Sequence, residues 1–182
     1  DKRTMVPFAA SSIPLVTLGT FLLWFGWFGF NGFSQLAMGT FDDVTAVTKI
    51  AVNTHLAGAA GTVAGAAITR LLGGKTDIIM MLNGALAGLV AITAEPLTPS
   101  PMLAIFIGAV GSIIMYFGTK MLENLGLDDV VGAIPVHMFA GIFGTLVVPL
   151  SNGDTSFGTQ VIGTVSVVVF SFILSYAVFT AL

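Results

Sequence analysis

The sequence predicts an all-α membrane protein built as a polytopic helical bundle. Of its 182 residues 55% are hydrophobic and only 8% are charged, and the mean hydropathy is +1.00. Soluble domains of this length rarely combine these values. A bilayer core of roughly 30 Å requires about 20 apolar residues per helical span, and the chain offers several such stretches. We therefore expect spanning helices and not a porin-type barrel.

Hydropathy, read together with the positions of glycine, proline and charge, divides the chain into six expected spans. They cover residues 13–33, 44–72, 78–94, 102–122, 131–149 and 158–181. The second span is longer than a bilayer needs, so we expect its start near Lys49 to lie in the interface or the helix to tilt. The chain begins at Asp1 and its last span runs up to Leu182, so we expect a piece of a longer polypeptide.

Positive charges gather at one end of the expected spans. They are Lys2, Arg3, Arg70, Lys75 and Lys120. The opposite end has Lys49 as its single cation, among Asp42, Asp43, Glu95 and Asp154. The positive-inside rule therefore predicts a multi-pass protein of the cell (plasma or inner) membrane, with both termini of this segment in the cytoplasm.

Composition and charge exclude several classes of function. The formal charge of −3 is small and scattered, which argues against a nucleic-acid partner. Cysteine is absent, so the chain has no disulfide, thiol nucleophile or thiolate metal site. The spans contain no pairing of nucleophile and base and no cluster of metal ligands, so we expect neither an enzyme nor a cofactor or metal site.

Small residues recur four positions apart within the spans. Gly61 and Gly65 form one such pair, and Gly84 and Gly88 form another. This spacing lets helix backbones approach closely, and we interpret it as a packing signal without a link to function.

A histidine in the fifth span is the first polar group that needs an explanation. His137 lies near Pro135, with Gly141 and Gly144 on the same helical side, so we expect it to face protein and not lipid. The residues alone leave two roles open, a hydrogen bond between helices and a place in a pore or relay. Pro135 favours the pore slightly, because it frees a carbonyl that only packing or a cavity can satisfy.

Other polar residues near the spans favour structural roles. His55 stands beside Asn53 and Thr54, a grouping that suits a hydrogen-bond network between helices. Asp128 and Asp129 precede the fifth span and are placed to cap its start.

The first span ends in an unusual density of aromatic rings. Trp27, Phe30 and Ser34 are spaced to share one helix face, with Asn31 beside them. Aromatic stripes of this kind are most often packing surfaces, so the spacing alone does not establish a binding role.

Four motifs together resemble one known family. They are LGTFLLWFGWFGFNGFS from Leu18, VNTHLAGAAG from Val52, NGALAGLVAITA from Asn83 and LDDVVGAIPVHMFAGIFGTL from Leu127. In this order they resemble the Amt/Mep/Rh ammonium transporter family, and the Amt branch most closely. The family fold has two inverted five-helix repeats and a final helix. The resemblance implies that this chain is the second repeat plus the final helix, helices six to eleven, without the first repeat.

The resemblance also implies roles for individual residues. Phe30 resembles the inner of two stacked gate rings, Ser34 the hydroxyl of an outer ammonium site, Trp27 a ring of the pore wall and His137 the second of twin pore histidines. Asn31 is expected beside this pore, and the supporting residues near it are Asn53, His55 and Asp129.

The chain departs from the family pattern in two places. Phe33 stands where the family commonly has glycine before the serine, and Pro135 and Met138 replace glycines around the histidine. These differences bear on the shape of the pore.

The resemblance implies nitrogen uptake by an ammonium transporter or channel, and not an enzyme. Ammonium is recruited at the outer site, loses a proton and passes a hydrophobic pore lined by histidine. The implied partners are ammonium or ammonia, the lipid bilayer, two further copies in a homotrimer and a cytoplasmic regulatory protein of the PII type. The alternative is an ammonium-sensing membrane domain fused to a signalling enzyme.

Overall fold

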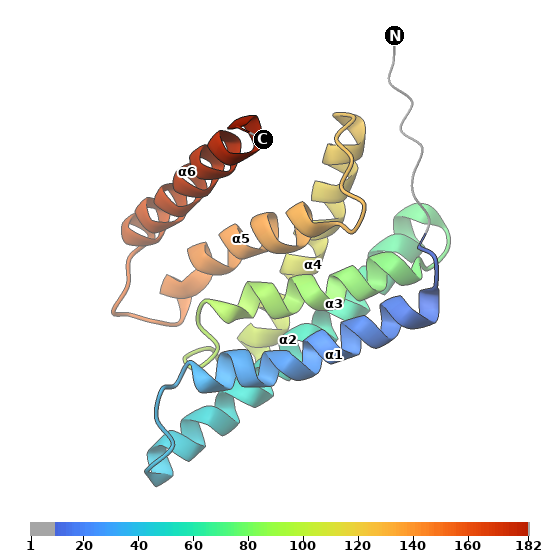
Figure 1. Cartoon of the computed structure of the whole chain (residues 1–182). Coiled ribbons are helices and arrows are strands. Elements are labelled where there is room, and N and C mark those ends of the chain that lie inside the picture. Colours follow the sequence, from blue (N-terminus) through green and yellow to red (C-terminus); the bar gives the residue numbers. More distant parts are fainter. Residues whose placement is uncertain (1–9, 182) are drawn as a thin grey trace.

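The computed structural model describes residues 10–181, and this range forms helices and no strands (Figure 1). The α-helices are α1 (Ile13–Phe33), α2 (Phe41–Gly73), α3 (Ile78–Thr93), α4 (Pro101–Asn124), α5 (Ala140–Val147) and α6 (Phe157–Ala181). A π-helical turn, η1 (Ile134–Phe139), leads into α5, and a 3-10 turn, η2 (Val148–Leu150), follows it. The predicted all-α class is confirmed.

Four of these helices, α1, α2, α4 and α6, are long and apolar enough to cross a membrane. The other two apolar segments, α3 and the run from Ile134 to Leu150, are shorter. At about 1.5 Å per residue, the 16 residues of α3 extend roughly 24 Å, less than a typical bilayer core.

Local side-chain chemistry sets the helix boundaries. The second helix starts at Phe41, before the expected residue 44, because Thr40 and Asp43 form a capping box. It ends at Gly73 and is followed by Gly74, whose φ of 75° suits glycine. The fifth segment starts at Ile134, after the expected residue 131, because Gly132 has a φ of 74° that a helix does not contain.

The helices run alternately up and down the bundle. Figure 1 places the start of α1, the α2–α3 connection, the α4–α5 connection and the end of α6 toward one end, and the other connections toward the opposite end. Arg70, Lys75 and Lys120 lie at that first end, as their positions in α2, the α2–α3 connection and α4 require. Lys2 and Arg3, which also carried the orientation prediction, lie outside the described residues.

The core of the bundle is a contact between helix backbones. A Cβ atom built on Gly84 of α3 would lie 2.7 Å from the Gly61 carbonyl oxygen of α2 and 2.6 Å from Ser112 Oγ of α4. On α4, a Cβ on Gly108 would collide with the backbone of Ala57 in α2. Glycine therefore permits the three helices to pack as closely as they do.

Two apolar clusters complete this core. One joins Ala57, Ala91, Ile92, Ala104 and Ile107 of α2, α3 and α4. The other joins Ala87, Met115, Val136 and Ala140, and so attaches η1 and α5 to α3 and α4.

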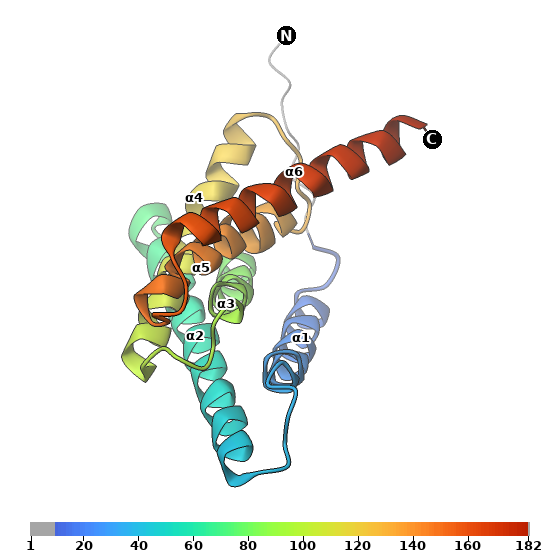
Figure 2. The same cartoon turned by 90° about the vertical axis from the view of Figure 1, so that its left-hand side faces the viewer.

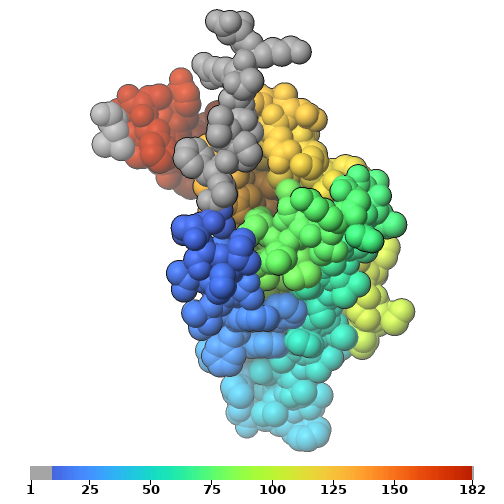
Figure 3. All heavy atoms as spheres, turned by 90° about the vertical axis from the view of Figure 1, so that its right-hand side faces the viewer, coloured from blue at the N-terminus to red at the C-terminus, as the bar shows by residue number. Residues whose placement is uncertain are grey.

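The final helix stands apart from this core. None of the residues Phe157–Ala181 is buried, although α6 is strongly apolar. It contacts α5 and leans away from the remaining helices (Figure 2). In the space-filling view of Figure 3, α6 (red) projects from the bundle near one end, and the start of α2 (cyan) projects at the other. An apolar helix so placed requires lipid or further protein around it.

We predict that Gly108→Ala destabilises the protein by about 1–3 kcal/mol, because the new methyl group would meet the Ala57 backbone and the helices would have to separate. Denaturant unfolding of the full-length protein in detergent measures this loss. The matched control is Gly163→Ala on α6, where nothing lies within 4 Å and the better helix propensity of alanine is stabilising by up to about 1 kcal/mol. Equal stability of both variants would contradict the prediction.

Candidate functional site

The aromatic residues of α1 are anchored to α3. The indole nitrogen Nε1 of Trp27 donates a hydrogen bond of 2.7 Å to Thr93 Oγ1. The ring of Trp27 lies 6.1 Å from the ring of Phe30, at an angle of 57°. Phe30 is 65% exposed, so one side of it meets Trp27 and much of its face is free. Such a free ring face attracts cations through its quadrupole.

A hydroxyl group follows these rings one helical turn later in the chain. Ser34 follows the last residue of α1, is exposed, and donates its proton to the Phe30 carbonyl at 2.8 Å. Its oxygen lone pairs are consequently free to accept a hydrogen bond from a cation such as an ammonium group.

Asn31 lies on a different side of the same helix. It is only 1% exposed, and its Nδ2 atom donates to Thr54 Oγ1 of α2 at 3.0 Å. The structure therefore places Asn31 between helices, where its visible role is to join α1 to α2.

His137 lies in the π-helical turn η1 and is exposed among the described residues. The N–H of Ala140 bonds the carbonyls of both His137 and Pro135, which identifies the widened turn. Turns of this type are rare and are often found at functional sites. About two helical turns after His137, Gly144 of α5 packs onto the backbone of Ala91 in α3, which fixes the helix that follows the histidine.

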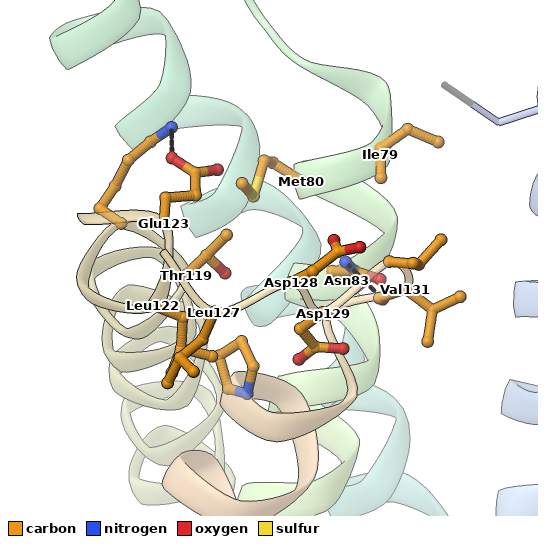
Figure 4. Close-up of a pocket in the computed structure, with 14 residues that line it drawn as sticks. Ile79, Met80, Asn83, Thr119, Leu122, Glu123, Leu127, Asp128, Asp129 and Val131 are labelled. Carbon is orange, nitrogen blue, oxygen red and sulfur yellow. Dashed lines mark hydrogen bonds and ion pairs between the residues drawn. The ribbon is translucent and has the colours of Figure 1, made fainter. Parts of the chain in front are cut away.

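Two polar groups stabilise the start of η1. The carboxylate of Asp129 accepts from the backbone N–H of Ala133 at 2.9 Å and of Ile134 at 2.7 Å, which is the capping role considered from the sequence. Pro135 has no N–H for the carbonyl of Val131, four residues earlier. Asn83 of α3 donates to that carbonyl at 3.2 Å instead (Figure 4).

These groups line a pocket of about 490 Å³ between α3, α4 and the α4–α5 connection (Figure 4). Lys120 and Glu123 form an ion pair of 2.8 Å at its edge. The pocket lies at the end of the bundle that also carries Arg70 and Lys75.

Polar contacts also join the loops at the opposite end. Asn53 of α2 donates to the carbonyls of Pro96 and Pro99, each at 2.9 Å. Glu95 accepts from Asn152 at 2.8 Å and so connects the α3–α4 loop to the α5–α6 loop. Together these bonds join helix α2 to the α3–α4 connection, and that connection to the α5–α6 connection.

His55 lies outside this network. Asn53 and Thr54 are buried and hydrogen-bonded, whereas His55 is exposed beside the rings of Trp24 and Phe28, with ring centroids 5.5 Å and 6.2 Å away. Three consecutive helical residues point in three directions, so the polar run could not place all its members in one interface.

The structure brings together some of the predicted site residues and keeps others apart. Trp27, Phe30 and Ser34 are neighbours on α1, which packs on α2 and α3. The segment of His137, η1, packs on α3 and α4 instead. Within residues 10–181, no group of three or more acidic or histidine side chains could hold a metal ion.

Sequence reasoning missed the partners of these residues, Thr93, Asn83, Glu95 and Asn152. Pro135 signalled that a carbonyl needed a donor, but nothing in the sequence pointed to Asn83.

The fold and these groups define a polytopic helical membrane protein. The profile of the Ammonium Transporter Family matches residues 1–182. The chain is 47% identical over 147 residues to ammonium transporter Amt2 of Archaeoglobus fulgidus, covering 81% of this chain and 30% of that protein. It is 40% identical over 167 residues to a putative ammonium transporter of Synechocystis sp., covering 90% of this chain and 38% of that protein.

Solved structures of ammonium transporter proteins also resemble this chain. A structure described as a sensor Amt protein superposes with a TM-score of 0.86 at 32% identity, covering 94% of this chain and 44% of that one. The crystal structure of Candida albicans Mep2 superposes with a TM-score of 0.87 at 26% identity, covering 98% of this chain and 43% of that one.

The chain belongs to the ammonium transporter family and is a multi-pass membrane protein. The family consists of transporters and not of enzymes. The chain spans 30% and 38% of the lengths of the two curated relatives above.

We predict that Asp129→Ala lowers stability by about 0.5–2 kcal/mol, because the start of η1 would lose both its side-chain acceptors. Hydrogen exchange at the Ala133 and Ile134 amides, measured on the full-length protein, should become faster. Asp128→Ala is the matched control, since this neighbouring carboxylate makes no hydrogen bond within residues 10–181 and its loss should leave both amides protected. Equal exchange in the two variants would show that Asp129 is not the cap.

Proposed function

We propose that this chain forms half of an ammonium-conducting pore and contributes the outer recruitment site and one pore histidine. The observation that carries the proposal is the end of α1, where the exposed ring of Phe30 is followed one helical turn later by the accepting oxygen of Ser34. Membership of the ammonium transporter family supports the same cargo. Ammonium needs both groups, a ring face for its charge and an acceptor for its N–H bonds.

The energetics favour recruitment of the cation and passage of the neutral molecule. An isolated ion that enters a medium of low dielectric constant faces an idealised penalty of about 20 kcal/mol. A ring face returns only about 2 kcal/mol of this. Aromatic residues can therefore hold ammonium at the mouth, whereas the apolar constriction passes ammonia after a proton has left.

His137 is the residue of this chain suited to the pore beyond the rings. Its imidazole offers both a donor and an acceptor when neutral, so it can pass a hydrogen bond along a line of ammonia molecules. The rest of the pore, with a second histidine and an outer gate ring, belongs to the first repeat in our proposal.

The proposed assembly follows the family pattern. Three copies would form a homotrimer in the cell membrane, each with its own pore, and both ends of the segment would face the cytoplasm. A PII-type protein is the regulatory partner we expect on that side. Mass measurement of the detergent-solubilised complex tests the number of copies.

We expect Ser34→Ala to weaken the apparent affinity for methylammonium by about tenfold, because a hydrogen bond to a charged group contributes roughly 1.5 kcal/mol. Uptake into liposomes over a concentration series measures this. Ser34→Thr keeps the hydroxyl and should retain most of the affinity. An unchanged affinity in Ser34→Ala across a pH series would remove Ser34 from the site.

We also expect negligible potassium current through the unmodified full-length protein in liposomes, because potassium can occupy a ring face but has no proton to release. His137→Asp should admit some potassium by placing an anion in the wall, if the first-repeat histidine leaves room. His55→Asp is the control for an added carboxylate and should admit none. Substantial potassium current in the unmodified protein would overturn the deprotonation mechanism.

A second candidate is an ammonium sensor, and the solved structure described as a sensor Amt protein favours it. In that case the same recruitment site would control a fused signalling enzyme. The full-length polypeptide distinguishes the two, because a sensor carries a catalytic domain and shows ligand-dependent catalysis, whereas a transporter shows ammonium flux without one.

A further inference from the structure

We propose that Thr93 is a positioning residue that sets substrate selectivity by holding the aromatic pair of Trp27 and Phe30. This inference rests on the proposed function, since it assumes that the pair borders the path of the substrate. It assigns a role to a residue of α3 that has no place in the recruitment site itself.

The hydroxyl oxygen of Thr93 is available only as a hydrogen-bond acceptor. Its hydroxyl donates to the Leu89 carbonyl at 2.7 Å, which uses its only proton. Its oxygen then accepts from Trp27 Nε1, also at 2.7 Å. The indole nitrogen of Trp27 can only donate a hydrogen bond, and the Thr93 oxygen can only accept one, so the two groups match. Within a membrane span few other acceptors are available to replace this one.

The neighbouring tryptophan of α1 is held in a different way. Trp24 packs over Gly58 of α2, where a Cβ atom would come within 2.8 Å of its ring. Close packing therefore fixes Trp24. Trp27 depends instead on a directional bond at the outer edge of its ring, which prevents the ring from turning.

The position of Trp27 determines that of Phe30. Their ring centroids are 6.1 Å apart, and Phe30 is 65% exposed in this chain, so Trp27 borders a ring that the described residues otherwise leave largely open. Thr93 thus acts on the ring that borders the recruitment site through Trp27, without touching the substrate.

The test uses the full-length protein in liposomes and compares initial uptake rates of ammonium and methylammonium. The ratio of the two rates does not depend on the amount of folded protein. Thr93→Val keeps the shape and removes the acceptor, so the methylammonium-to-ammonium ratio should rise about threefold or more as the pair loosens. Thr93→Ser retains the acceptor and should keep the original ratio, and Thr93→Cys, a weak acceptor, should lie between them.

A spectroscopic measurement reports the bond directly. The indole N–H resonance that disappears in Trp27→Phe identifies Trp27, and it should shift upfield in Thr93→Val but not in Thr93→Ser. The matched control is Thr62→Val on α2, because Thr62 donates to Gly58 of its own helix at 2.9 Å and its loss should move neither readout.

The outcomes separate this inference from the proposed function. An unchanged ratio or an unmoved resonance in Thr93→Val would overturn the positioning role, while a change of ratio in Phe30→Ala would still support the pore. If Phe30→Ala and Trp27→Phe both leave the ratio unchanged, the proposed function itself fails and the inference fails with it.

Discussion

Close contact between helix backbones is the constraint on which the rest of this structure depends. Lipid is as apolar as leucine, so helices in a bilayer gain little from burying large side chains and associate instead where their backbones meet. In this chain the meeting points are Gly61 against Gly84 and Gly108 against Ala57. They make α2, α3 and α4 a rigid group of three helices. The remaining helices, which carry the candidate site, are attached to this group.

The central member of this group, α3, connects the two halves of the candidate site. On one side Thr93 holds the indole of Trp27, and on the other Ala91 receives the backbone of α5 at Gly144. At the end of the helix, Glu95 reaches Asn152 in the next loop. The aromatic pair and the segment that carries the histidine therefore both depend on contacts with one short helix.

Much of the fold could be predicted from the sequence because a bilayer imposes a simple length rule on apolar helices. The glycine pairs were interpreted correctly as packing signals because their spacing has one physical meaning. The partners of polar residues could not be predicted in this way. Asn53 and His55 stand two positions apart in one polar run, yet the first is buried and the second is exposed, since burial depends on which side of a helix meets its neighbour. The bond between Trp27 and Thr93 joins residues 66 positions apart, beyond any local pattern.

The π-helical turn around His137 separates the helix into two parts with different registers. The part after it is fixed by Gly144, whose backbone contact with Ala91 leaves no freedom to rotate. The part that bears His137 is offset from this contact by the extra residue of the widened turn. Loss of a single residue there would restore an ordinary helix and turn the histidine by about 100° without disturbing the packing of α5. The direction of the His137 imidazole thus depends on the number of residues between the histidine and Gly144, as well as on which residues these are.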